Sequence, residues 1–146
     1  MKGLAARLLA GGVTGVLALA VAVVAGVGLT QNATHGDPKV DLSGLPDMPK
    51  ERVRAYREAA GHRDLFQHLP CYCGCALLDE PHASLDRCFY APDGTLEPHA
   101  AGCRICSEIA LLAADLVHQG ASHAEVRAQV DATFTGVGPA TDTPLP

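Results

Sequence analysis

Three of the six cysteines in this chain lie close together, as Cys71, Cys73 and Cys75. A disulfide between alternate cysteines closes a very small ring and strains the preferred disulfide dihedral angle. Three thiolates on one short turn can instead converge on a soft ion such as Cu(I) or Zn(II). Gly74 suits such a turn, because glycine readily adopts a positive φ. The spacing therefore predicts a thiolate metal site.

The other three cysteines lie downstream, as Cys88 alone and as the pair Cys103 and Cys106. The pair falls in the first turn of a helix predicted over residues 102–119, where residues three apart share a face. Backbone N–H groups at a helix N-terminus also favour a thiolate. This chemistry suits a metal ligand and a redox thiol equally well. We expect five cysteines to bind the metal, with one more cysteine and two histidines as additional or supporting ligands: Cys71, Cys73, Cys75, Cys103 and Cys106, then Cys88, His82 and His99.

Helical periodicity dominates the residues around these cysteines. Apolar residues recur at intervals of three and four over 102–119, and Ser122 with Glu125 predicts a capping box at the start of a last helix. Two shorter helices are predicted over 49–61 and 63–69. Prolines interrupt the residues between, which we expect to form one long cysteine-rich loop. The fold class predicted is therefore a small all-α domain with a long Cys-rich loop.

Composition divides the chain into four parts. Residues 1–30 are predicted to be a signal anchor or signal peptide, and 31–48 a flexible linker. The helical domain covers 49–135, and the glycines and prolines of 136–146 predict a disordered tail. A domain of this size gains much of its stability from metal ions or disulfides.

The N-terminal part predicts a transmembrane or signal helix. Lys2 and Arg7 precede an uncharged apolar run over 8–29, which is long enough for the about 20 residues that span a bilayer. A cleaved signal has a shorter apolar core, so an uncleaved anchor is favoured. Because the positive charges precede the run, the remainder is expected outside the cytoplasm. The localisation predicted is the cell membrane, or secretion if the signal is cleaved.

Charge and motifs exclude several functions. The chain carries a net charge of −5, and no basic patch indicates nucleic-acid binding. No phosphate loop, catalytic triad or carboxylate pair is present, so we expect neither nucleotide binding nor hydrolase activity. The protein is predicted not to be an enzyme, with redox activity of its thiols as the alternative that stays open. The remaining histidines are scattered, which predicts solvated or helix-surface roles for His35, His62, His68, His118 and His123.

Pro70 to Cys75, together with the segment 82–89 and the later cysteine pair, resembles the bacterial family named for its Pro-Cys-Tyr-Cys-Gly-Cys motif. The resemblance covers roughly residues 50–135. It implies an exported, membrane-anchored protein with a metal or thiol role. If the cysteines bind a metal, a metal-trafficking protein is the partner that we expect. Members often carry a lipobox, which this chain lacks, so lipidation is not expected here.

Two classes of function remain open from the residues alone. The first is a binding protein for a soft metal, with Cu(I) favoured and Zn(II) nearly as suitable. The second is a secreted domain held by three disulfides, or a redox protein with an exchangeable Cys103–Cys106 pair, because an even cysteine count in an oxidising compartment is typical of disulfides. Against the disulfides, each cysteine of the first cluster would need a distant partner. We favour the metal-binding protein.

Overall fold

The computed structural model describes residues 39–78 and 82–146, and the description below is limited to them. All described residues belong to one compact unit. This part is helical and has no named strand, which confirms the predicted all-α class for the described residues. The elements in chain order are α1 (Lys50–Gly61), α2 (Arg63–Phe66), the 3₁₀ turn η1 (Cys75–Leu77), α3 (Asp86–Phe89), α4 (His99–Gly102), α5 (Arg104–His118) and α6 (His123–Phe134).

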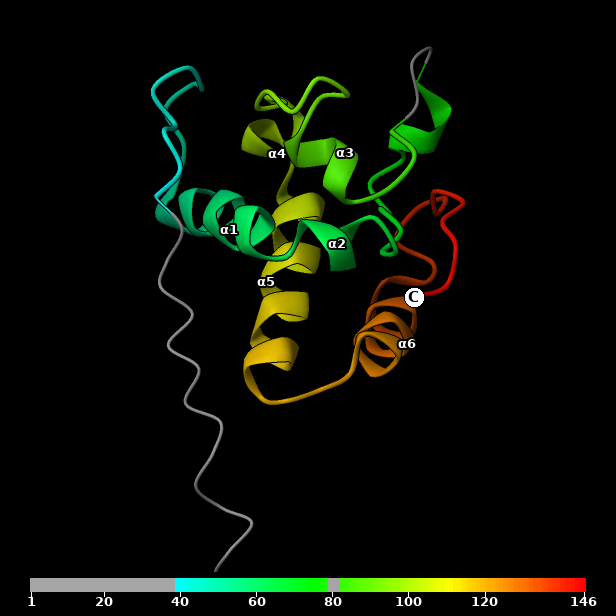
Figure 1. Cartoon of the computed structure of the whole chain (residues 1–146). Coiled ribbons are helices and arrows are strands. Elements are labelled where there is room, and N and C mark those ends of the chain that lie inside the picture. The colour runs from blue at the N-terminus through cyan, green and yellow to red at the C-terminus, as the bar shows by residue number, and fades with distance from the viewer. Residues whose placement is uncertain (1–38, 79–81) are drawn as a thin grey trace, which may run out of the picture. The chain divides into compact units, whose positions relative to one another are not determined.

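Three longer helices form the framework. Both α1 and α6 pack against α5 (Figure 1), and buried side chains of all three meet in one core. The helix α6 begins with the predicted capping box, in which Ser122 and Glu125 bond each other's backbone N–H groups. Its buried face carries Val126, Val130 and Phe134, as the periodicity predicts.

The short helix α3 is held in place by an ion pair whose carboxylate is buried. Asp86 is 3% exposed, and its two carboxylate oxygens accept hydrogen bonds from the Arg63 guanidinium at 3.0 and 3.1 Å. Arg63 also lies over the Tyr90 ring, 4.2 Å from the ring centroid. Because a buried carboxylate requires such partners, the pair fixes α3, and with it Cys88, against α2.

The segment between α2 and α5 differs from the uninterrupted loop that was predicted. It contains η1, α3 and α4, and α4 is separated from α5 at Cys103, whose backbone is extended. Each of these elements has only three or four residues, which is too short for an apolar repeat to reveal. Two side chains of α1 hold α4: Arg52 donates to the carbonyl of Ala101 at 2.6 Å, and the Tyr56 hydroxyl accepts from the Ala101 N–H at 3.1 Å.

The described part of the predicted linker, residues 39–48, contributes to the core. Leu42, Leu45 and Met48 are partly buried against it. The predicted transmembrane or signal helix lies outside the described residues. Among the residues that are described, no helix has the length and apolar character needed to cross a membrane.

Residues 136–146, for which the composition predicts a disordered tail, fold back over the cysteine-bearing turn. The N–H of Cys71 donates to the Thr141 hydroxyl at 2.9 Å, and the N–H of Thr141 donates to the Cys71 carbonyl at 3.0 Å. Gly138 packs so closely that a Cβ would lie 2.6 Å from the carbonyl oxygen of Tyr72. Arg127 of α6 donates to the Thr143 hydroxyl at 3.0 Å. The red C-terminal segment accordingly runs beside the green turn in Figure 1.

Replacing Thr141 by valine is expected to destabilise the domain by about 1–3 kcal/mol, because the buried N–H of Cys71 loses its acceptor while the side-chain volume is kept. Chemical denaturation measures the effect. The control is Thr133→Val on exposed α6 surface, where a change within about 0.5 kcal/mol is expected. Equal stability of the two variants would show that the tail does not support the turn.

Candidate metal centre

The first cysteine cluster occupies a turn that points its side chains inward. Gly74 has a φ of 89°, so the predicted need for a positive φ at this position is confirmed. Cys71 and Cys75 are buried, and Cys73 is partly exposed. The Cys71 and Cys73 sulfurs lie 3.3 Å apart. The turn therefore presents three sulfurs to one small volume.

The later pair enters the same volume from the N-terminus of α5. The prediction that Cys103 lies within the first turn of this helix is wrong, because Cys103 is its N-cap residue. The Cys103 sulfur accepts a hydrogen bond from the N–H of Cys106 at 3.5 Å. The Cys106 sulfur is buried 3.5 Å from that of Cys71 and 3.7 Å from that of Cys73. Two segments distant in the sequence thus meet through their sulfur atoms.

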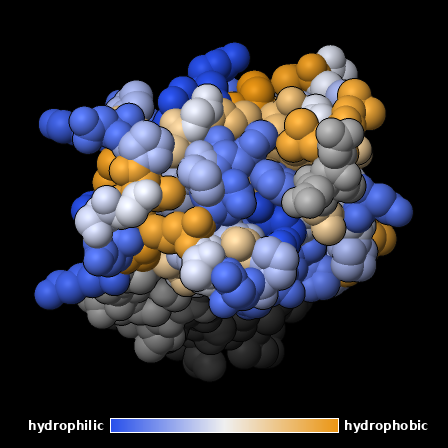
Figure 2. All heavy atoms as spheres, turned by 90° about the horizontal axis from the view of Figure 1, so that it is seen from above, coloured by the Kyte–Doolittle hydropathy of each residue, from blue (hydrophilic) through white to orange (hydrophobic). Residues whose placement is uncertain are grey.

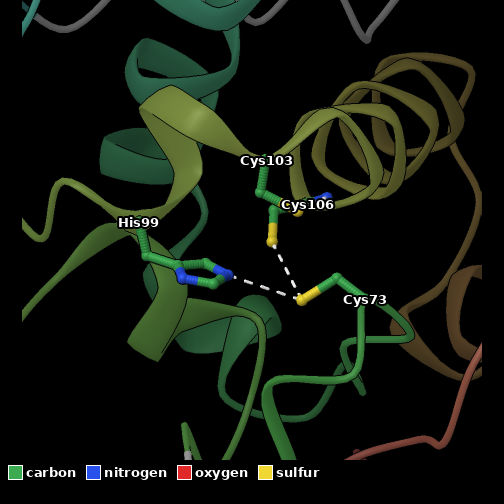
Figure 3. A group of neighbouring side chains, drawn as sticks. All are labelled: Cys73, His99, Cys103 and Cys106. Carbon is green, nitrogen blue, oxygen red and sulfur yellow. Dashed lines mark hydrogen bonds between the residues drawn. The ribbon is translucent and has the colours of Figure 1, made fainter. Parts of the chain in front are cut away.

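Four of the ligands make a set of the Cys₃His type. Cys73, His99, Cys103 and Cys106 each offer one ligand atom, and these atoms all lie within 4.8 Å of one another. Figure 3 shows the side chains converging from the turn, from α4 and from the start of α5. The Cys73 sulfur is 3.5 Å from Nε2 of His99. Three sulfurs and one imidazole nitrogen are a known donor set for a tetrahedral metal ion.

The remaining sulfurs form overlapping groups deeper in the core. Cys71, Cys88 and Cys106 are all buried and make one group, and Cys71, Cys73 and Cys75 make another. The Cys75 and Cys88 sulfurs are 4.0 Å apart. Because Cys71 and Cys106 recur in these groups, the six sulfurs form one continuous cluster rather than separate pairs.

His82 lies at the edge of the cluster. Its ring meets the His99 ring edge-on, with 4.7 Å between the centroids. His82 also groups with Cys75 and Cys88 as a fourth set of ligand atoms within 4.8 Å of one another. Its Nδ1 is buried and has no hydrogen-bond partner among the described residues. A buried nitrogen without a partner is costly, and a bound metal ion would relieve that cost.

The electrostatics favour a cation at the centre. Hydrogen bonding by the Cys103 and Cys106 thiols lowers the pKa of Cys73, whereas contact with Cys106 and the other sulfurs raises the pKa of Cys88. Hydrogen bonds to Cys103 and Cys73 raise the pKa of His99 to about 10. The pKa of Cys71 is lowered too, so some thiolates are stabilised at the expense of others, because buried negative charges repel each other. A metal ion would compensate several thiolates at once.

The six cysteines, all of which are described, are free. The Cys71 and Cys73 sulfurs, for example, are 3.3 Å apart, well beyond the about 2.05 Å of a disulfide bond. The structure brings all eight predicted residues into this one region. Sequence reasoning missed the residues that support the centre, Thr141 behind the turn and Arg52 and Tyr56 behind α4, because their contacts join segments far apart in the chain.

Fold and site together define a class: a cysteine-rich protein, all-α over its described residues, whose clustered thiols and imidazoles could hold a metal ion. The chain belongs to the family described as protein of unknown function with PCYCGC motif, whose model matches residues 27–146. The resemblance of the motif to that family is thereby confirmed. Searches of curated proteins and of solved structures find no match.

Proposed function

We propose that this chain is an extracytoplasmic metal-binding protein that holds a soft ion, Cu(I) in preference to Zn(II), at its six-cysteine centre. The observation that carries the proposal is the convergence of Cys73, His99, Cys103 and Cys106 within 4.8 Å, in contact with the other sulfurs. The competing hypothesis is a structural or redox role for the cysteines. Free thiols that cluster together support this hypothesis less than they support metal binding.

The preference for Cu(I) rests on the number and arrangement of sulfurs. Zn(II) in structural sites takes four ligands in a tetrahedron, and the Cys₃His set alone would satisfy it. The centre has additional sulfurs in overlapping three-sulfur groups, two of which share Cys71. Soft thiolates select Cu(I), which accepts low coordination numbers, so a cluster of overlapping triads can hold more than one such ion.

The proposed setting follows from the N-terminal sequence. An anchor over residues 1–30 would hold the domain on the outer side of the cell membrane, where a metal-trafficking protein is the proposed partner. Exchange with such a partner needs at least one accessible ligand. Cys73 and Cys103 are partly exposed, whereas the other four cysteines are buried, so these two supply the accessible side of the centre.

Thiol alkylation with intact-mass measurement tests the proposal. The full chain, purified without oxygen, is expected to bind Cu(I) at a defined stoichiometry and to protect its thiols from alkylation only while the metal is present. A control sample denatured before alkylation should take up six labels, one for each cysteine. A native protein six hydrogens lighter, with no thiol to alkylate, would contain three disulfides and would contradict the proposal for that state.

A further inference from the structure

A second cluster of potential ligands lies where α1 and α5 pack together, away from the cysteines. Glu58 belongs to α1, His62 directly follows that helix, and His118 ends α5. Their ligand atoms lie within 4.8 Å of one another. The sequence predicts separate surface roles for the two histidines. The helix α1 packs on α5 (Figure 1), and both histidines lie close to one carboxylate.

The distances within this cluster resemble those between metal ligands. Nε2 of His62 and Nε2 of His118 each lie 3.8 Å from the same oxygen, Oε2 of Glu58. That is too long for a hydrogen bond, which needs about 2.7–3.2 Å. Bonds of about 2.0–2.1 Å to a tetrahedral ion place neighbouring ligand atoms about 3.3 Å apart. A contraction of about half an ångström would therefore bring each histidine nitrogen to that distance from the carboxylate oxygen. The third separation, between the histidine ligand atoms, is within 4.8 Å.

The other oxygen of the same carboxylate is occupied from the opposite side. Oε1 of Glu58 accepts a hydrogen bond from Nε of Arg54 at 3.3 Å, and Arg54 also pairs with Asp115. A ligating carboxylate is commonly oriented by such a hydrogen bond. Arg54 thus turns Oε2 toward the histidines, and its own charge is shared by two carboxylates.

Burial leaves one side of the cluster open. The side chains of His62 and Glu58 are 10% and 18% exposed, and that of His118 is 39% exposed. Two histidines and one glutamate with a solvent-filled fourth position are a donor set known from zinc proteins. We propose that Glu58, His62 and His118 form a second metal site, which takes a divalent ion such as Zn(II) or Co(II) rather than Cu(I).

The second site differs from the cysteine centre in chemistry and in place. It offers nitrogen and oxygen atoms without sulfur. The soft thiolates of the cysteine centre therefore favour Cu(I), whereas the harder ligands of the second site favour a divalent ion. Cys106 and His118 lie near opposite ends of α5, and the helical rise places their backbones about 18 Å apart. The two sites can therefore be filled and measured independently.

The test uses the full chain with Cu(I) already bound at the cysteines and adds Co(II) as the probe. We expect one equivalent of Co(II) to bind, with weak visible absorption and without the intense near-ultraviolet band of cobalt–thiolate bonds. His118→Ala should weaken Co(II) binding by at least about 100-fold, because it removes a direct ligand. Glu58→Gln keeps the shape of the side chain but removes its charge, and should weaken binding as well.

The matched control is His123→Ala, which removes an exposed histidine from the first turn of α6. This variant should bind Co(II) as the unaltered chain does. The inference is overturned if the copper-loaded protein binds no Co(II), or binds it equally in the His118 and His123 variants. A cobalt–thiolate band that is indifferent to His118 would place the Co(II) at the cysteines and would also overturn it.

Discussion

Replacing Cys73 by serine is expected to lower the affinity for Cu(I) by more than about 100-fold. Losing a residue that only orients a metal ligand typically costs about 10- to 100-fold, and Cys73 is itself a proposed ligand. Cys73 belongs both to the Cys₃His set and to the three-sulfur group of its own turn. A serine hydroxyl stays protonated at neutral pH and is a hard oxygen donor, so it cannot replace a thiolate for a soft ion. Anaerobic competition with a chelator of known affinity measures the loss.

The matched control for this prediction is Cys88→Ser. Cys88 lies outside the Cys₃His set, and its replacement hydroxyl can donate to the carbonyl of Ser84, which the Cys88 thiol already approaches at 3.8 Å. We expect this variant to keep tight binding of the first ion and to lose total capacity. Equal loss of first-ion affinity in the two variants would contradict a centre based on the four-ligand set.

The largest effect on stability is expected from Phe89→Ala, at about 3–5 kcal/mol. Phe89 is fully buried in α3, and its ring meets Tyr56 edge-on at 5.0 Å between centroids and Phe66 at 6.2 Å. Removing the ring leaves a cavity between α1, α2 and α3. Since small domains have only about 5–15 kcal/mol of stability in total, the metal-free variant should unfold at a markedly lower denaturant concentration.

Leu145→Ala is the control for the core, because Leu145 is 75% exposed and a change within about 0.5 kcal/mol is expected there. Adding metal should recover part of the stability of the Phe89 variant, since an ion that binds only the folded state stabilises it. A loss no larger than that of the Leu145 variant would mean that α3 is not anchored by its aromatic contacts.

The sequence predicts well those helices whose signals are local. The stop of α1 at Gly61 and the capping box at Ser122 and Glu125 depend on residues within one turn of each other, and the structure reproduces both. The salt bridge between Arg127 and Asp131 is also a local contact, because the two residues are one helical turn apart, and Nε of Arg127 lies 2.8 Å from Oδ2 of Asp131. Period and caps are visible in such segments because each spans several turns.

The features that the sequence does not predict depend on long-range contacts. The helices α3 and α4 have four residues each, and they exist because Asp86 bonds Arg63 and Ala101 bonds Arg52 and Tyr56. The segment 136–146 has the composition of a disordered tail, yet its backbone pairs with the cysteine turn. A prediction of disorder from composition considers only the residues of the segment itself. It does not include the contacts that the segment makes with the cysteine turn once the domain has folded.

The cysteine centre and the proposed second site show the same division. The spacing of Cys71, Cys73 and Cys75 predicts a common site, because neighbouring residues on a turn must lie close together. The approach of His62 to His118 has no such signal, since nothing local joins the end of α1 to the end of α5. Ligands contributed by packed helices become visible only when the helices are placed.

The pairing of Thr141 with Cys71 also sets an order of events during synthesis. The ribosome adds Cys106 thirty-five residues after Cys71, and it adds Thr141 seventy residues after Cys71. While the chain is still growing, the first three thiols have neither their helical partners nor the segment that covers them. The nascent turn is then most exposed to oxidants, and under the proposed function a metal ion would be bound by the complete site only after Thr141 has been made.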